Sequence, residues 1–85
     1  MESIKNLINR MLWDEKENKE DYSFYYLDRI EHKEKEIKGM DLLKTDGSFI
    51  VVERTKDDGQ KEEAEIPMHR IRRVKKIDNT IWKRN

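Results

Sequence analysis

The N-terminal residues show the clearest pattern of apolar and polar positions in the chain. The apolar positions recur every three or four residues and are Ile4, Leu7, Ile8, Met11 and Leu12. This spacing places them on one face of an α-helix, and the hydroxyl of Ser3 can cap its first turn. We predict a helix that starts after Ser3 and ends at Leu12, with Trp13 folding back onto the core. The alternative is a longer helix that presents Trp13 to solvent beside Arg10.

From residue 22 onward the apolar period changes to two, which is typical of β-strands. We predict strands at residues 22–27, 42–43, 49–54, 62–66 and 80–84, and a short turn followed by a strand after Pro67. Turns are expected at 46–47, 57–59 and 78–79, where Asp, Asn and Gly cluster. Residues 31–38 carry charges of both signs and are predicted to form an exposed connection. Tyr22, Phe24 and Phe49 are assigned to the interior.

The composition fits a single compact domain spanning residues 1–85. Charged residues make up 45% of the chain and the mean hydropathy is −1.15, but a net charge of zero removes the self-repulsion that favours disorder. We expect an α+β fold, in which the N-terminal helix is followed by a mostly antiparallel sheet of four to six strands that could curl into a small barrel. The absence of cysteine excludes disulfides and thiolate metal sites. No apolar run reaches the ~18 residues of a membrane span, so we expect a cytoplasmic protein without a membrane partner.

Positive charge is concentrated at the C-terminal end. Residues 68–85 contain seven Lys or Arg against one acid, Asp78, and therefore carry a formal charge of +6. His69 and Arg70 follow Pro67 directly, where the backbone is stiff. A guanidinium can donate two parallel hydrogen bonds to phosphate oxygens, and an imidazole can add another. The pattern indicates an anion site, with Arg73, Lys75 and Lys76 available for a phosphate backbone.

Structural roles for the same residues stay open at this point. His69 could cap a turn by bonding a carbonyl, and Arg70 could pair with one of the many acids. Asp28 and Arg29 could form a surface ion pair, or Asp28 could orient Arg29 toward a ligand. Trp13, Tyr25 and Trp82 could stack on bases or belong to the core. No Gly-rich phosphate loop, nucleophile elbow or zinc-binding histidine pair is present, so we expect no cofactor, no metal and no assigned catalytic residue.

Four separated motifs resemble those of a small archaeal family. The motifs are LINRMLWD at residues 7–14, YLDR at 26–29, EIPMHRI at 65–71 and WKR at 82–84. The family is the RNA cyclic-group end recognition domain, formerly classed as a domain of unknown function. The chain departs from it at Met11, where a β-branched residue is common, and at residues 31–38, where the family often has glycine.

The resemblance implies recognition of RNA ends, especially those carrying a 2′,3′-cyclic phosphate, in a family that also occurs fused to RNA-processing modules. The polar motif positions that it carries onto this chain are Asn9, Arg10, Trp13, Asp14, Asp28, Arg29, His69, Arg70, Trp82 and Arg84. Partners would then be RNA, mainly its 3′ ends, and RNA-processing enzymes.

Three hypotheses follow. The first is an RNA-binding module without catalysis, in which Arg29, His69 and Arg70 surround a terminal phosphate and Trp13 or Trp82 stacks on the last base. The second is an RNA-end-processing enzyme of the phosphodiesterase type that uses His69 as general acid or base. The third is a protein-interaction module that uses the edge of the aromatic strand.

Overall fold

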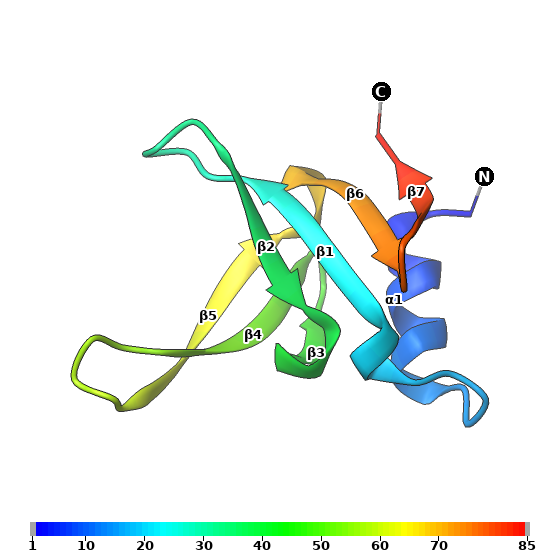
Figure 1. The fold of residues 1–85 in the computed structure, drawn as a ribbon, viewed down its shortest axis with the longest axis horizontal. Helices are drawn as coiled ribbons and strands as arrows, with labels where there is room; N and C mark the ends of the chain where they lie inside the picture. Colours follow the sequence, from blue (N-terminus) through cyan, green and yellow to red (C-terminus); the bar gives the residue numbers. More distant parts are fainter. Residues whose placement is uncertain (1, 85) are drawn as a thin grey trace.

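The structure is a computed structural model that describes residues 2–84, and these residues form one α-helix and seven β-strands (Figure 1). The elements are α1 (Ile4–Trp13), β1 (Tyr22–Leu27), β2 (Glu34–Lys38), β3 (Leu42–Asp46), β4 (Phe49–Thr55), β5 (Lys61–Pro67), β6 (Ile71–Lys76) and β7 (Asn79–Lys83). Three single-turn 3-10 helices precede strands: η1 (Lys19–Asp21), η2 (Gly39–Asp41) and η3 (Met68–Arg70). The α+β class is confirmed.

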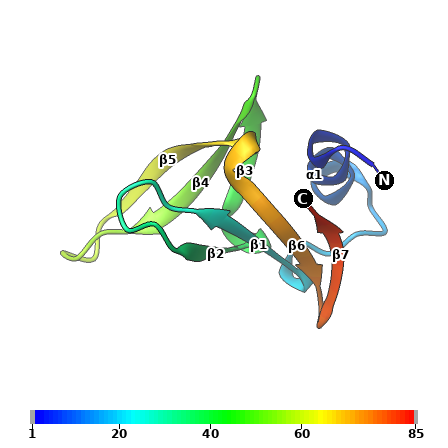
Figure 2. The ribbon, with the colours of Figure 1, turned by 90° about the horizontal axis from the view of Figure 1, so that it is seen from above.

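The strands form two antiparallel sheets that do not close into a barrel. One has the order β2-β1-β6-β7 and the other the order β3-β4-β5. In Figure 2 the two sheets lie on opposite sides of the interior, and α1 lies on the side of β7. Phe24 pairs with Ile37 on one side and Val74 on the other, while Ile50 pairs with Ile66 across the second sheet. These apolar pairs face inward, so each sheet leaves its other face to solvent.

The apolar stripe of α1 forms as predicted. Ser3 caps the helix by accepting a hydrogen bond from the backbone amide of Asn6 at 3.1 Å. Leu7, Ile8 and Met11 are fully buried. The predicted helix end was wrong, because α1 continues through Trp13 and leaves that side chain 77% exposed. One further residue of helix turns Trp13 away from the apolar stripe.

The core is made of side chains from the helix and both sheets. The buried cluster contains Tyr22, Phe24, Leu42, Ile50, Ile71, Val74 and Trp82 together with the stripe of α1. Phe49 was wrongly assigned to the interior, since its side chain is 40% exposed at the start of β4. Trp82 belongs to the core, where its indole nitrogen donates a hydrogen bond of 2.9 Å to the backbone carbonyl of Glu2. No charged side chain of residues 2–84 is buried.

Two further expectations need correction. Residues 34–38 form β2 rather than an exposed connection, because β1 supplies backbone hydrogen bonds to a segment with one buried side chain, Ile37. The last hairpin turns at Ile77 and Asp78, one residue earlier than predicted, since Asn79 already pairs with Lys76. Ile77 adopts a positive φ of 58°, and its backbone amide donates to the carbonyl of Asp21 at 2.7 Å.

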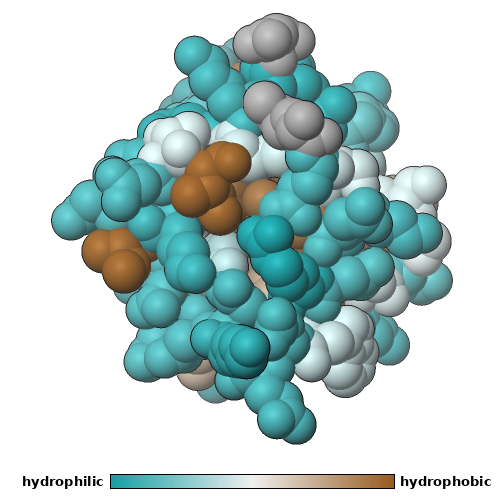
Figure 3. All heavy atoms as spheres, turned by 90° about the vertical axis from the view of Figure 1, so that its right-hand side faces the viewer, coloured by the Kyte–Doolittle hydropathy of each residue, from teal (hydrophilic) through white to brown (hydrophobic). Residues whose placement is uncertain are grey.

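The outer surface follows from the composition. The side of the molecule with α1 and β7 is mostly hydrophilic, and hydrophobic residues reach it only in small separate spots (Figure 3). Within residues 2–84 no helix has the length and apolar character needed to cross a membrane.

Candidate functional site

An open pocket of about 470 Å³ lies at one end of the four-stranded sheet. Its wall is formed by the loop between β1 and β2 and by the segment that contains η3 and the start of β6. The lining residues are Leu27, Asp28, Arg29, His32, His69, Arg70 and Arg72. Segments 40 residues apart in the sequence meet here because β1 and β6 are paired antiparallel, which brings the end of β1 beside the start of β6.

Asp28 organises the loop that carries Arg29 and His32. One carboxylate oxygen accepts hydrogen bonds from the backbone amides of Ile30 and Glu31 at 2.8 and 2.9 Å. The second oxygen lies 3.3 Å from the ammonium of Lys35. The backbone bond from Glu31 is the largest of the effects that hold the pKa of Asp28 below its usual range. Asp28 therefore supports the loop and is not the ion-pair partner of Arg29.

The loop closes with His32 in a left-handed conformation. Its φ is 54°, a region in which histidine is found more often than most residues. The backbone amide of His32 donates to the carbonyl of Asp28 at 3.0 Å, and the amide of Asp28 donates to the carbonyl of Lys33 at 2.9 Å. This tight return places the imidazole of His32 on the wall of the pocket.

Arg84 holds the opposite wall. Its Nε donates to the carbonyl of Ile71 at 3.0 Å and its terminal nitrogen donates to the carbonyl of Met68 at 3.4 Å. These carbonyls flank His69 and Arg70, so the guanidinium bridges both ends of the turn that presents them. The amide of Met68 is fixed in turn by the carbonyl of Ser48 at 2.8 Å. Arg84 thus acts as a positioning residue for this wall.

The arginine and histidine side chains of the pocket lack protein partners among the described residues. In the part of the chain that the structure describes, no side-chain hydrogen bond or ion pair involves Arg29, His32, His69, Arg70 or Arg72. Most other charged clusters of the molecule do contain ion pairs. The one acid in the lining, Asp28, is engaged by backbone amides and Lys35. Hydrogen-bond donors of one sign of charge therefore converge on an open volume, as in sites for phosphates and carboxylates.

The donor set is poorly suited to a cation. Among residues 2–84 no three His, Asp or Glu side chains are arranged to hold a metal ion. The three arginines of the pocket would repel a divalent ion, whereas each can donate a pair of hydrogen bonds to one oxyanion.

A second, smaller pocket adjoins the first. It has a volume of about 330 Å³ and is lined by Ile4, Lys5, Gly47, Ser48, Met68, His69 and Arg84. His69 lines both pockets and so forms the boundary between them. Arg84, a predicted ligand residue, lies in this second pocket and not in the first.

Arg73 and Lys75 lie on the solvent-exposed face of the four-stranded sheet, outside both pockets. Arg73 forms a bidentate ion pair with Glu34, with a shortest N–O distance of 2.7 Å, and its guanidinium lies 4.0 Å from the ring centre of Tyr25. Hydrogen bonding to Arg73 holds the pKa of Glu34 below its usual range. Lys75 lies 5.9 Å from the same ring. Their proposed contacts with an RNA backbone stay predictions.

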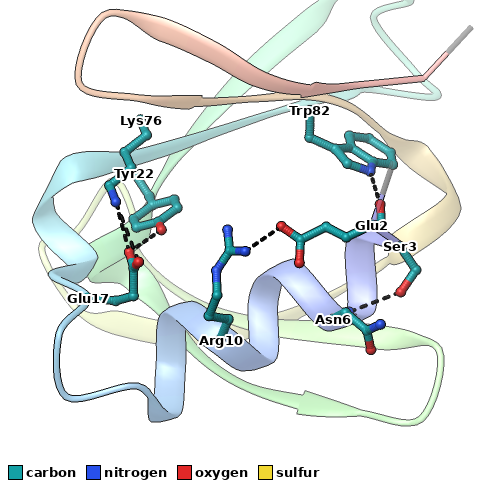
Figure 4. Close-up of polar contacts among 8 residues, drawn as sticks. All are labelled: Glu2, Ser3, Asn6, Arg10, Glu17, Tyr22, Lys76 and Trp82. Atoms are coloured by element: carbon teal, nitrogen blue, oxygen red, sulfur yellow. Dashed lines mark hydrogen bonds and ion pairs between the residues drawn. The ribbon is translucent and has the colours of Figure 1, made fainter.

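The predicted residues of α1 are also outside the pocket. Arg10 pairs with Glu2 at 2.7 Å and points into the space between α1 and the β6–β7 hairpin, on the side of Tyr22 (Figure 4). Asn9 and Trp13 line neither pocket. Asp14, the other acidic motif residue, accepts a hydrogen bond from the amide of Lys16 at 2.9 Å and shapes the turn after the helix.

Trp82 cannot stack on a base as predicted, because the residue is only 7% exposed and its indole nitrogen donates a hydrogen bond to the backbone carbonyl of Glu2 (Figure 4). Trp13 is exposed, and its stacking role stays a prediction. Burial of Trp82 follows from pairing of Trp82 with Val74, which points the indole to the interior.

Sequence reasoning missed His32 and Arg72. His32 lies in the charged segment that was predicted to be an exposed connection, and no apolar pattern marks it as part of a hairpin. The one available signal was Asp28, a residue type that often bonds the backbone two or three residues ahead and so starts a tight turn. Arg72 lies where the pairing of β1 with β6 shifts register, which no sequence pattern reveals.

Comparison with known proteins gives a family match over nearly the whole chain. The family model described as the MJ1316 RNA cyclic group end recognition domain matches residues 1–84. A UPF0248 protein of Saccharolobus islandicus is 33% identical over 84 residues, which cover 95% of this chain and 98% of the relative. A UPF0248 protein of Saccharolobus solfataricus is also 33% identical, over 95% of both chains. No solved structure gives a significant match.

Proposed function

Since this chain belongs to the MJ1316 RNA cyclic group end recognition domain family, we propose that it is an RNA-binding module that holds RNA ends in the pocket between the β1–β2 loop and η3. The observation that carries the proposal is the convergence of five cationic or imidazole side chains that have no protein partner among the described residues. Three of the five are arginines, whose like charges repel one another, so an anionic ligand would stabilise the cluster. A module of this kind would present the bound end to a separate RNA-processing enzyme.

The proposed ligand group is a terminal 2′,3′-cyclic phosphate. It carries one negative charge and two free oxygens, whereas a 3′-phosphate carries nearly two charges at neutral pH. Arg29 and Arg70 come from opposite walls of the pocket and would each donate to the phosphate, with His69 completing the set. A site that responded to charge alone would prefer the 3′-phosphate. A preference for the cyclic phosphate would require that the shape of the pocket fit the cyclic group better than the 3′-phosphate.

The test is a binding comparison with one short RNA of fixed sequence and three different ends. We expect the cyclic-phosphate RNA to bind more tightly than the 3′-hydroxyl RNA at the same salt concentration. Equal affinity for these two would overturn the proposal. Tighter binding of the 3′-phosphate than of the cyclic form would reassign the pocket to terminal phosphates in general.

A second candidate function is hydrolysis of the cyclic phosphate, and the observation that favours it is the presence of both histidines in one pocket. His69 would take a proton from water as the water oxygen attacks phosphorus. The bond from phosphorus to one bridging ribose oxygen would break, and His32 would protonate that oxygen to leave a phosphate monoester. This step consumes one water and needs no metal.

Incubation of the protein with cyclic-phosphate RNA, followed by analysis of the end group, separates the two candidates. If the protein hydrolyses the cyclic phosphate, a monoester end should form with the wild-type protein and should not form with His32→Ala or His69→Ala. An unchanged end group after prolonged incubation leaves the binding module as the function.

A further inference from the structure

We propose that the 330 Å³ pocket, which adjoins the 470 Å³ pocket proposed to hold the terminal phosphate (the end-group pocket), binds the nucleotide that precedes the RNA end. This inference rests on the proposed function, because it takes the larger pocket as the site of the terminal phosphate. The ligand is the penultimate ribonucleotide with its phosphodiester group, so the protein would read a dinucleotide unit and not an isolated end group.

The position of His69 is the first argument. Among the described residues, His69 is the one residue that lines both pockets, so the two pockets adjoin at this residue. Two consecutive nucleotides are joined by a single phosphodiester group, and this group would pass beside the imidazole.

The chemistry of the second pocket is the next argument. Lys5 and Arg84 supply positive charge, Ser48 supplies a hydroxyl, and no acid is among the lining residues. Lys5 is exposed at the start of α1 and takes part in no ion pair among the described residues. Arg84 uses Nε and one terminal nitrogen for carbonyls, which leaves its other terminal nitrogen for a ligand.

The walls of the pocket suit the remainder of a nucleotide. Ile4 and Met68 contribute nearly buried apolar residues to the lining, at 8% and 6% exposure. Gly47 turns the β3–β4 hairpin with a φ of 60° and contributes no side chain to the opening. A lining that combines apolar residues with a few charged groups is the usual composition of a small-ligand site, and the volume falls at the lower end of the range for such sites.

The test compares a nucleoside 2′,3′-cyclic phosphate with a dinucleotide that has the same cyclic end. We expect the dinucleotide to bind about tenfold more tightly to the wild-type protein, the low end of what a hydrogen bond to a charged group contributes. Lys5→Ala should remove most of this advantage and leave the affinity for the mononucleotide unchanged. The variant should fold, because Lys5 is exposed and alanine is a stronger helix former.

Lys61→Ala is the control, since Lys61 is also exposed and lies at the start of β5, beside the β4–β5 turn, which points away from α1 in Figure 1. It removes a lysine of the same charge together with one exposed ion pair, to Glu53 at 3.1 Å. It should keep the advantage of the dinucleotide. Equal affinity of the wild-type protein for the two ligands would overturn the inference, as would an advantage that Lys5→Ala leaves intact. Failure of the proposed function looks different, because the mononucleotide would then show no preference for a cyclic phosphate over free hydroxyls.

Discussion

Replacement of Arg70 by alanine is the most direct perturbation of the end-group pocket. Arg70 is half-buried on the pocket wall and forms no ion pair or side-chain hydrogen bond within the described part of the chain. Its removal therefore takes no ion pair or side-chain hydrogen bond from the described part of the folded protein. The effect of Arg70→Ala should fall on ligand binding alone.

The size of the effect follows from the contacts that Arg70 would make. A hydrogen bond to a charged group contributes about 1.5 to 3 kcal/mol. Loss of one such bond raises the Kd for a cyclic-phosphate RNA by roughly 10-fold to 150-fold. Arg70→Lys keeps the charge and loses the two-point geometry, so its Kd should lie between those of the wild type and Arg70→Ala. The free energy of unfolding should change by no more than about 0.5 kcal/mol, as for a surface side chain without partners.

Both quantities can be measured on the same samples, by titration of a labelled RNA and by urea unfolding. Arg54→Ala serves as the control, because Arg54 lies on β4 outside the pocket and its ion pair with Glu62 is long, at 3.5 Å. The reasoning fails if Arg70→Ala binds the cyclic-phosphate RNA as tightly as Arg54→Ala does. It also fails if Arg70→Ala loses more than about 1 kcal/mol of stability, because that would show a structural role.

Three further predictions concern the supports of the fold and site. Arg84→Met removes both hydrogen bonds to the carbonyls that flank the turn of His69 and Arg70. Urea unfolding should therefore show a free energy of unfolding lower by about 1.5 to 3 kcal/mol, and the affinity for RNA ends should fall as well. Unchanged affinity would contradict the positioning role. Glu17 accepts hydrogen bonds from Tyr22 and Lys76, and these bonds lower its pKa, with the bond from Tyr22 as the larger effect. The ionised Glu17 therefore contributes fully to the free energy of unfolding above its unfolded-state pKa of about 4.3, and this contribution is lost as the pH falls through the lower folded-state pKa. Glu17→Gln should therefore be less stable than wild type at pH 7 and lose less stability on acidification, and parallel pH curves would argue against it. Trp82→Phe should lose about 1 kcal/mol or more, because the indole bond to Glu2 disappears, yet bind RNA ends normally.

The parts of the fold that the sequence predicts well are those with a one-sided apolar pattern. The stripe of α1 and the alternation of β1 each bury one face, so burial and periodicity agree. The apolar pattern does not predict β2, because only one apolar side chain of this strand, Ile37, reaches the core. The strand forms through its backbone hydrogen bonds with β1. Phe49 shows the converse error, since an aromatic residue at the end of a strand can lie beyond the cover of the opposite sheet.

The site was predictable only where residues adjoin in sequence. His69 and Arg70 stand out beside Pro67, and Arg29 stands out after an aromatic strand. Their meeting with His32 depends on strand pairing, which composition does not reveal. The family motifs that resemble this chain mix two kinds of residue. Some line the pocket, while Trp82 and Arg84 stabilise the core and the turn, and a motif alone does not distinguish these roles.

β2 also has a consequence for how copies of this protein behave together. It is one of the two edge strands of its sheet, and an edge strand exposes backbone donors and acceptors to which another molecule can add a strand. Glu34, Lys35, Glu36 and Lys38 place charge along that edge, which disfavours the addition of a strand from another copy. The absence of an apolar signal in this segment therefore disfavours edge-to-edge association between copies of the protein.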